Sequence, residues 1–112
     1  MNSKQAFKQA FTNNLNKDID SLMKNIEGAI DDGQYNCYST FNSLKTAYKD
    51  PLDAQKIIGN ILAKKGYENM KITCSRTNNC GFYIYISWNN DSEFAKKIVD
   101  ELYGENQTTY CE

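Results

Sequence analysis

The residues of this sequence that could carry out chemistry are carboxylates, cysteines and tyrosines, because histidine is absent. Without histidine, neither a Ser-His-Asp nor a Cys-His arrangement can form, and a zinc site would need cysteine or carboxylate ligands. Adjacent or near-adjacent acidic residues occur at Asp18/Asp20, Asp31/Asp32 and Asp100/Glu101. We expect these carboxylates to be solvated, because they fall mainly on the polar faces of predicted helices. With no glycine-rich phosphate loop and no base beside a nucleophile, we predict no catalytic residues, no cofactor and no enzymatic activity.

The four cysteines are Cys37, Cys74, Cys80 and Cys111. Their separations of 36, 5 and 30 residues contain no Cys-x-x-Cys pair, so an all-cysteine zinc site is only the alternative interpretation. The first residues lack the apolar core of a signal peptide, which favours reduced thiols in a cytosol over two disulfides. We predict free, metal-free thiols, with Cys37 and Cys74 as small apolar core residues.

The tyrosines are the most informative group. In the strand predicted at residues 82–88, Tyr83 and Tyr85 alternate with apolar residues, so they point away from them. If the apolar side packs under helices, these two rings stand on the open face of a sheet, and Tyr38 joins them from an earlier strand. We predict these three tyrosines as binding residues, since exposed rings stack on other rings; the alternative is cross-strand pairing that stabilises the sheet. Trp88, on the apolar side, is predicted to be largely buried.

Composition restricts the partner. The 112 residues contain 13 lysines and arginines against 14 acidic residues, a net charge of −1, and Arg76 is the only arginine. Nucleic-acid-binding proteins usually have a basic surface and rely on arginine, so nucleic acid is an unfavourable partner. No apolar run approaches the roughly 20 residues that span a bilayer. The fourteen asparagines, twelve lysines and eight tyrosines are typical of AT-rich coding sequence, as in AT-rich bacteria, their phages and some large DNA viruses.

The first element that must position these residues is an amphipathic helix at residues 3–32, whose apolar residues recur at steps of three and four. Unbroken, thirty residues span about 45 Å at 1.5 Å per residue. A domain of this size is only about 35 Å wide. The helix therefore either breaks at Asn13-Asn14 and folds back, or projects and needs a partner. In the second case the predicted oligomer interface consists of Phe7, Phe11 and Leu15.

The remaining patterns predict a strand at 34–41, a helix from Asp50-Pro51 to Gly66, a hairpin with strands at 70–75 and 82–88, and a final helix ending at Gly104. The order α-β-α-β-β-α predicts the α+β class, as a two-layer sandwich with helices on one face of a three-stranded sheet. A crossover through the middle helix makes the first two strands parallel, so we expect a mixed sheet. Residues 1–104 are predicted to form a single domain, and 105–112 a polar mobile tail.

Two segments resemble small phage and prophage proteins. One is Ile57-Ile58-Gly59-Asn60-Ile61-Leu62-Ala63-Lys64-Lys65-Gly66-Tyr67, a helix that ends in Gly-Tyr, and the other is Phe82-Tyr83-Ile84-Tyr85-Ile86-Ser87-Trp88, a hairpin strand that ends in Ile-Ser-Trp. The shared pattern is structural, because Gly66 caps a helix and Trp88 anchors a strand end. The resemblance implies a viral source; proteins of this kind are mostly uncharacterised, so it carries over no catalytic residues.

The first functional hypothesis is a small, non-enzymatic, phage-type binding protein that self-associates and binds a host protein or a small signalling molecule. Such a protein would act in the host cytoplasm, in an anti-defence or host-takeover role. The alternative is a structural component of the virion, such as a minor capsid or connector-associated protein. A nucleic-acid-binding protein is the second alternative, and no membrane association is expected.

Overall fold

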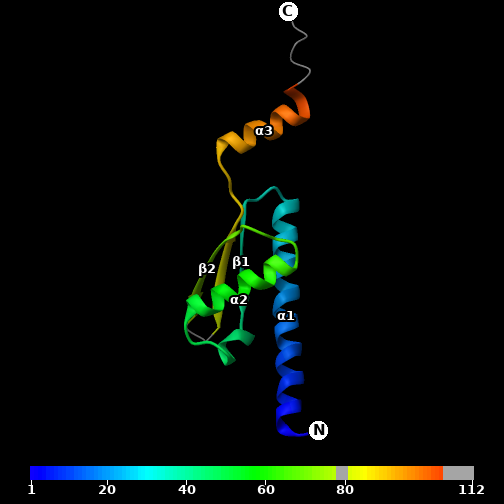
Figure 1. Cartoon of the computed structure of the whole chain (residues 1–112), viewed down its shortest axis with the longest axis vertical. Coiled ribbons are helices and arrows are strands. Elements are labelled where there is room, and N and C mark those ends of the chain that lie inside the picture. The colour runs from blue at the N-terminus through cyan, green and yellow to red at the C-terminus, as the bar shows by residue number, and fades with distance from the viewer. Residues whose placement is uncertain (78–80, 105–112) are drawn as a thin grey trace, which may run out of the picture.

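The structure is a computed structural model that describes residues 1–77 and 81–104. Its elements are α1 (Ser3–Asp31), β1 (Asn36–Phe41), the short 3-10 helix η1 (Ser43–Thr46), α2 (Pro51–Lys64), β2 (Lys71–Arg76), β3 (Phe82–Ser87) and α3 (Ser92–Tyr103). This order confirms the α+β class and the α-β-α-β-β-α succession (Figure 1). The central part of the predicted hairpin turn, 78–80, and the predicted mobile tail, 105–112, lie outside the described residues.

The sheet has the strand order β1-β3-β2, and β3 pairs antiparallel with both neighbours. The prediction of a mixed sheet was therefore wrong. β1 and β2 do run in the same direction, as the crossover through α2 requires, but β3 lies between them. β3 contains the most apolar and aromatic residues of the three strands, and the central place buries one of its faces and pairs its backbone on both sides.

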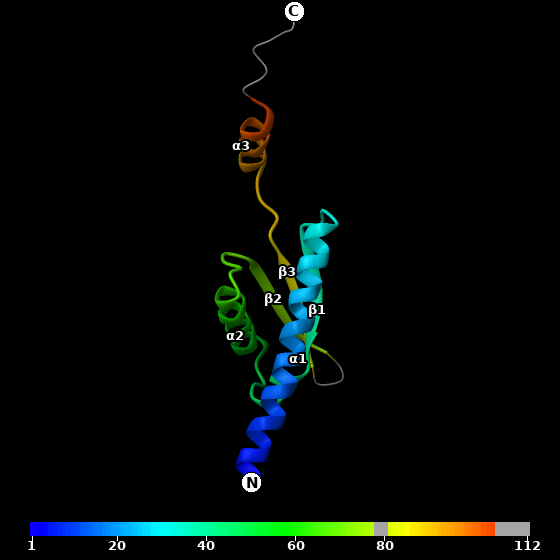
Figure 2. The ribbon, with the colours of Figure 1, turned by 90° about the vertical axis from the view of Figure 1, so that its right-hand side faces the viewer.

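Two helices cover one face of this sheet. α1 packs mainly on β1 and α2 on β2 (Figures 1 and 2). The core between the layers consists of Leu22, Ile26, Ala29, Cys37, Phe41, Leu44, Ala54, Ile58, Leu62, Cys74, Phe82, Ile84 and Ile86. The alternation of buried and exposed residues along β1 and β3 places the other side chains on the opposite face, which no helix of the described chain covers.

α1 is continuous through Asn13-Asn14, so of the two predicted alternatives the projecting helix is the one observed. It begins with a capping box in which the Gln5 amide donates to Asn2 Oδ1 and the Asn2 amide donates to Gln5 Oε1, both at 2.9 Å. All of its buried residues lie in the C-terminal half. The N-terminal half runs past the end of the sheet (Figure 1).

α2 begins and ends with local signals that the sequence makes plain. The Asp50 carboxylate accepts a hydrogen bond from the Leu52 amide at 3.0 Å, and Pro51 occupies the first helical position. At the other end Gly66 adopts the left-handed conformation, with φ of 93°, and the Tyr67 amide donates to the Leu62 carbonyl at 2.8 Å. This cap reverses the chain and directs it into β2.

α3 does not join the helical layer. It begins at Asp91, whose carboxylate accepts from the Phe94 amide at 2.9 Å, but of its twelve residues none is buried. The helix stands beyond the end of the sheet (Figure 1). The expectation that all helices share one face of a sandwich is therefore wrong for α3. Gly104 keeps a helical φ of −64° and does not form the left-handed cap.

Trp88 is only partly buried, which corrects the expectation that it is a largely buried core residue. It follows the last residue of β3 and packs against the edge of the core. Its backbone amide donates to the Tyr35 carbonyl at 3.0 Å, and its indole Nε1–H donates to the Gln34 carbonyl at 2.9 Å. The indole needs a polar partner, which explains why it lies at the margin of the core, beside the connection between α1 and β1.

Candidate functional site: an aromatic sheet face

The uncovered face of the sheet brings together the three tyrosines that the sequence singles out. Strand alternation places Tyr38 of β1 and Tyr83 and Tyr85 of β3 on this face, because their neighbours along each strand are buried under the helices. β2 contributes hydroxyl groups from Thr73 and Ser75 on the same side. Residues from three strands, separated by up to 47 positions in the sequence, thus form one surface.

The rings of Tyr38 and Tyr85 form a cross-strand pair. The two residues are direct partners in the β1–β3 register, with ring centroids 5.0 Å apart and ring planes inclined by 50°. This tilted arrangement is one that aromatic pairs favour. Tyr83 lies two residues along β3 and faces Thr40 on one neighbouring strand and Ser75 on the other. Tyr38 and Tyr83 remain 64% and 52% exposed, so their ring faces are open to a ligand.

A groove of about 520 Å³ runs over this surface and is lined by Tyr38, Thr73, Ser75, Tyr83, Ile84 and Tyr85. Aromatic and aliphatic carbon forms most of its wall, and the threonine, serine and tyrosine hydroxyls supply hydrogen-bond donors and acceptors. None of the six lining side chains is a carboxylate, a lysine or an arginine. The groove can therefore hold a planar group by stacking and hydrogen bonding, but its lining offers no strong acid, base or cation.

Two hydrogen bonds from Asn25 of α1 hold β1 in place from the helical side of the sheet. Asn25 Nδ2 donates to the Tyr38 carbonyl at 3.2 Å and to Ser39 Oγ at 3.1 Å. This contact joins residues more than a dozen positions apart and has no signature in the sequence. It positions the backbone of Tyr38 from the helical side and leaves its ring on the open side.

Asp18 also has a structural role that the sequence does not reveal. We expected a solvated carboxylate, but Asp18 Oδ2 accepts hydrogen bonds from the Ser43 amide at 2.8 Å and the Ser43 hydroxyl at 2.6 Å. The expectation was wrong for this residue, because its partner is 25 positions away and meets it only when η1 packs on α1. The contact ties the end of β1 to the middle of α1.

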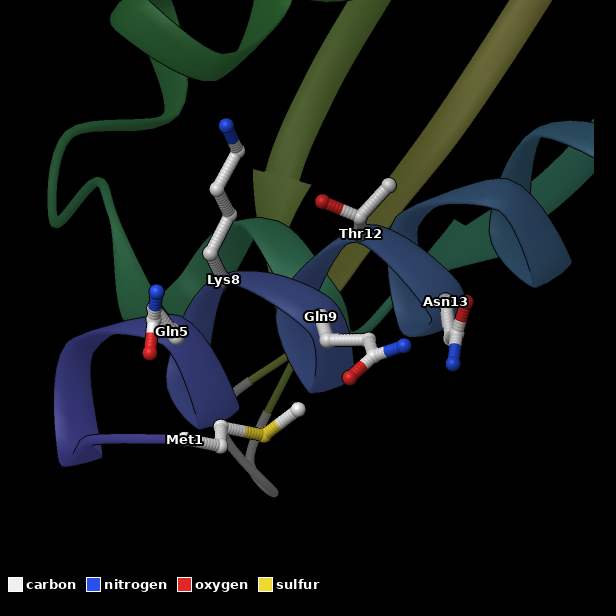
Figure 3. A pocket seen from close by; sticks show the side chains of 6 residues that line it. All are labelled: Met1, Gln5, Lys8, Gln9, Thr12 and Asn13. Carbon is white, nitrogen blue, oxygen red and sulfur yellow. The ribbon is translucent and has the colours of Figure 1, made fainter.

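A second recess lies along the projecting part of α1, with a volume of about 590 Å³. Figure 3 shows the polar side chains that line it, together with Met1: Gln5, Lys8, Gln9, Thr12 and Asn13. All of these residues belong to α1 except Met1, which precedes the helix, so the recess has no opposing wall. We therefore regard it as the polar side of an exposed helix, and the aromatic face as the stronger candidate site.

The predicted oligomer residues Phe7, Phe11 and Leu15 lie in one row on α1. The Phe7 and Phe11 rings stack with centroids 5.7 Å apart and an interplanar angle of 12°. Phe7 is 57% exposed, Phe11 is partly exposed, and Leu15 contacts the edge of the core. The row therefore continues the buried stripe of α1 beyond the sheet and into solvent.

Cys37 and Cys74 are buried and free, on the helix-facing side of β1 and β2. Burial raises the pKa of both thiols, because the apolar core disfavours the thiolate. Cys80 and Cys111 lie outside the described residues. Among the side chains that are described, no cluster of three cysteines or carboxylates is arranged to hold a metal ion.

No protein-family model matches the sequence, and neither a curated protein nor a solved structure is significantly similar to it. The helices of residues 1–77 and 81–104 include none with the length and apolar character needed to cross a membrane. The features of the molecule that bear on function are the aromatic sheet face and the two exposed helical segments, the start of α1 and α3.

Proposed function

We propose that this is a small, non-enzymatic binding protein of phage type, acting in the host cytoplasm. Its ligand-binding surface is the groove over Tyr38, Tyr83 and Tyr85, and its target presents a planar ring, on a small signalling molecule or on the surface of a host protein. The observation that carries the proposal is the exposure of these rings around one groove. Its volume, about 520 Å³, falls within the roughly 300–1,000 Å³ of ordinary ligand sites.

Cross-strand stabilisation leaves part of this surface exposed and free to bind a ligand. It explains Tyr38 and Tyr85, which contact each other across the two strands. Tyr83 pairs with Thr40 on β1, an aromatic–β-branched pair that also stabilises the sheet, and with Ser75 on β2, but no ring lies directly opposite it and it remains half exposed. A large aromatic residue that stands half exposed between two small hydroxyl residues forms one wall of a groove, and this favours a binding role.

Protein NMR with ring-containing probes tests the proposal. Indole, phenol and adenosine are titrated separately into ¹⁵N-labelled protein, and we expect saturable shifts of the Thr73, Ser75 and Tyr83 amides with at least one of them. Tyr83→Ser should weaken binding of that probe at least about fivefold, because one stacked ring contributes roughly 1–3 kcal/mol. Tyr35→Ser is the matched control, since Tyr35 is also more than half exposed but lies outside the groove. Shifts that do not saturate, or an equal loss in both variants, would contradict the proposal.

Self-association through Phe7, Phe11 and Leu15 is the second part of the proposal. Its support is that α1 extends past the sheet with an apolar row in which Phe7 is exposed and Phe11 partly exposed, while Leu15 packs against the edge of the core. Leaving such side chains in water forgoes roughly 1.5–3 kcal/mol each. Sedimentation velocity at tens of micromolar should therefore show a species larger than the monomer. A monomer under these conditions would contradict self-association but would not affect the groove proposal.

A structural component of the virion is the second candidate, since two exposed apolar helical segments also suit a protein that is held in a larger assembly. Mass spectrometry of purified particles separates the two, because a virion component is present in fixed copy number and a cytoplasmic binder is not. Nucleic acid is less well supported as the partner, because the lining of the groove contains no lysine or arginine to contact phosphate.

A further inference from the structure

We infer that two copies of this protein form a two-fold dimer in which α3 of each copy packs on the projecting part of α1, residues 3–15, of the other. The inference rests on the proposed self-association and names the surface that meets the Phe7 row. The alternative pairing is one α1 packed on another α1 through the same row.

The first observation is that α3 exposes an apolar stripe. Phe94, Ala95, Ile98, Val99 and Leu102 share one side of the helix, at spacings of one, three and four residues. Phe94 and Leu102 are 52% and 64% exposed. A helix with such a one-sided distribution is stable only when another surface covers the apolar side, because short isolated helices are marginal in water.

The second observation is that the apolar row at the start of α1 and the apolar row of α3 have the same spacing. Phe7, Phe11 and Leu15 on α1 and Phe94, Ile98 and Leu102 on α3 both follow the pattern i, i+4, i+8, each beginning with phenylalanine. Rows at i±4 form the ridges that pack into the grooves of a facing helix. The lengths also agree, since residues 3–15 span about 20 Å and the twelve residues of α3 about 18 Å at 1.5 Å per residue.

The third observation is position. The projecting end of α1 and the α3 helix lie at opposite ends of the molecule in both views (Figures 1 and 2). They cannot cover each other within the observed arrangement of one chain. A second copy in the reverse orientation places each stripe beside its counterpart, and the contact then occurs twice about a single two-fold axis. Such an arrangement is closed and leaves neither stripe free for further addition.

The charges of the two segments favour α3, and not a second α1, as the helix that packs on the projecting part of α1. Residues 3–15 contain Lys4 and Lys8 and no acidic residue. Residues 91–103 contain four acidic and two basic residues, a net charge of −2. Pairing two α1 ends brings like charges together, whereas pairing α1 with α3 brings opposite charges together. Electrostatic complementarity of this kind suppresses the wrong partner and sets the register of the contact.

Photo-cross-linking identifies the occupant directly. Phe7 is replaced by the photoreactive analogue p-benzoylphenylalanine, and equal amounts of ¹⁴N- and ¹⁵N-labelled chains are mixed before irradiation. We expect mixed-isotope cross-links from position 7 to residues 92–103. Mixed-isotope cross-links to residues 3–15 would overturn the inference while upholding self-association. Cross-links confined to chains of one isotope, or a monomer in sedimentation, would contradict both the α1–α3 pairing and self-association. Neither result would affect the groove proposal.

A pair of α3 variants provides the quantitative test. Ile98→Ser lies on the apolar side of α3 and should raise the dimer dissociation constant at least about tenfold in sedimentation equilibrium. Lys96→Ser lies on the opposite side of the same helix and should leave the constant within about twofold. Neither residue contributes to the core, so the near-ultraviolet signal of Trp88 should be unchanged in both. An unchanged dissociation constant for Ile98→Ser would overturn the inference.

Discussion

α2 and α3 are both short amphipathic helices that begin at an aspartate cap, yet α2 is packed on β2 and α3 contributes no residue to the core. Their apolar rows have the same spacing, with Ala54, Ile58 and Leu62 in one and Phe94, Ile98 and Leu102 in the other. Periodicity in the sequence therefore predicts that a helix has an apolar side, but it does not predict which surface covers that side.

The difference between the two helices arises from the connections and from tertiary contacts. α2 is followed by the left-handed cap at Gly66, which reverses the chain, and it is tied to the sheet by Gln55, whose Oε1 accepts from the Cys74 amide at 3.1 Å. The chain enters α3 after Trp88 through Asn89-Asn90, where the Asn90 amide donates to Asn89 Oδ1 and the Asp91 amide to Asn90 Oδ1, both at 3.0 Å. The row of α2 also starts with a small residue, Ala54, that allows close approach to β2, whereas the row of α3 starts with Phe94.

The largest expected effect comes from truncating the middle residue of each row. Ile58→Ala should lower the free energy of unfolding by about 2–5 kcal/mol, because Ile58 is fully buried and its removal leaves a cavity. Ile98→Ala should lower it by less than about 0.5 kcal/mol, because the side chain is exposed. Urea denaturation below one micromolar measures both in the dissociated chain. Equal costs would show that α3 packs on its own sheet.

The second largest effect on stability is expected from truncating the two aspartates that cap α2 and α3. Asp50→Ala should cost about 1 kcal/mol of global stability, because α2 is part of the cooperative core. In the dissociated chain, Asp91→Ala removes an equivalent hydrogen bond but should leave the global unfolding midpoint unchanged and reduce the helical signal of α3 alone. Amide hydrogen exchange resolves the two helices separately. A fall in the global midpoint in Asp91→Ala would contradict the independence of α3.

The smallest effect concerns pH and the thiols under the two packed helices. Burial raises the pKa of Cys37 and Cys74, so the folded state favours the neutral thiol more than the unfolded state does. Their contribution to stability is complete below about pH 8.5, the ordinary thiol pKa, and is lost as pH rises through the raised values. Each thiol contributes a slope of at most about 1.4 kcal/mol per pH unit.

The control for this effect is Cys37→Ala combined with Cys74→Ala. The double variant is less stable overall, but its free energy of unfolding should decline less steeply between pH 8 and 10 than that of the unmodified protein. Identical slopes in denaturation series across this range would show that these thiols do not titrate with unfolding.

Much of the fold and of the candidate site could be predicted from local patterns. Helical periodicity and the caps at Asp50 and Asp91 predict where α2 and α3 begin, and alternation predicts which side of β3 carries Tyr83 and Tyr85. These features depend on residues within one turn or one strand. The gathering of Tyr38 with them was also predictable in outline, because it needs only that the apolar sides of both strands face the same helices.

The remaining features depend on residues that are distant in the sequence. The central place of β3, the carboxylate contact of Asp18 with Ser43 and the partial burial of Trp88 all follow from pairings that no local spacing specifies. By itself, the sequence determined the type of each element and the side of it that is apolar, because periodicity and capping are local. Only the tertiary structure decided which apolar sides are covered. α2 and the second half of α1 pack on the sheet, and Phe7 lies beyond its end because α1 is longer than a six-residue strand. α3 lies beyond the sheet because the connection after β3 leads the chain away from it.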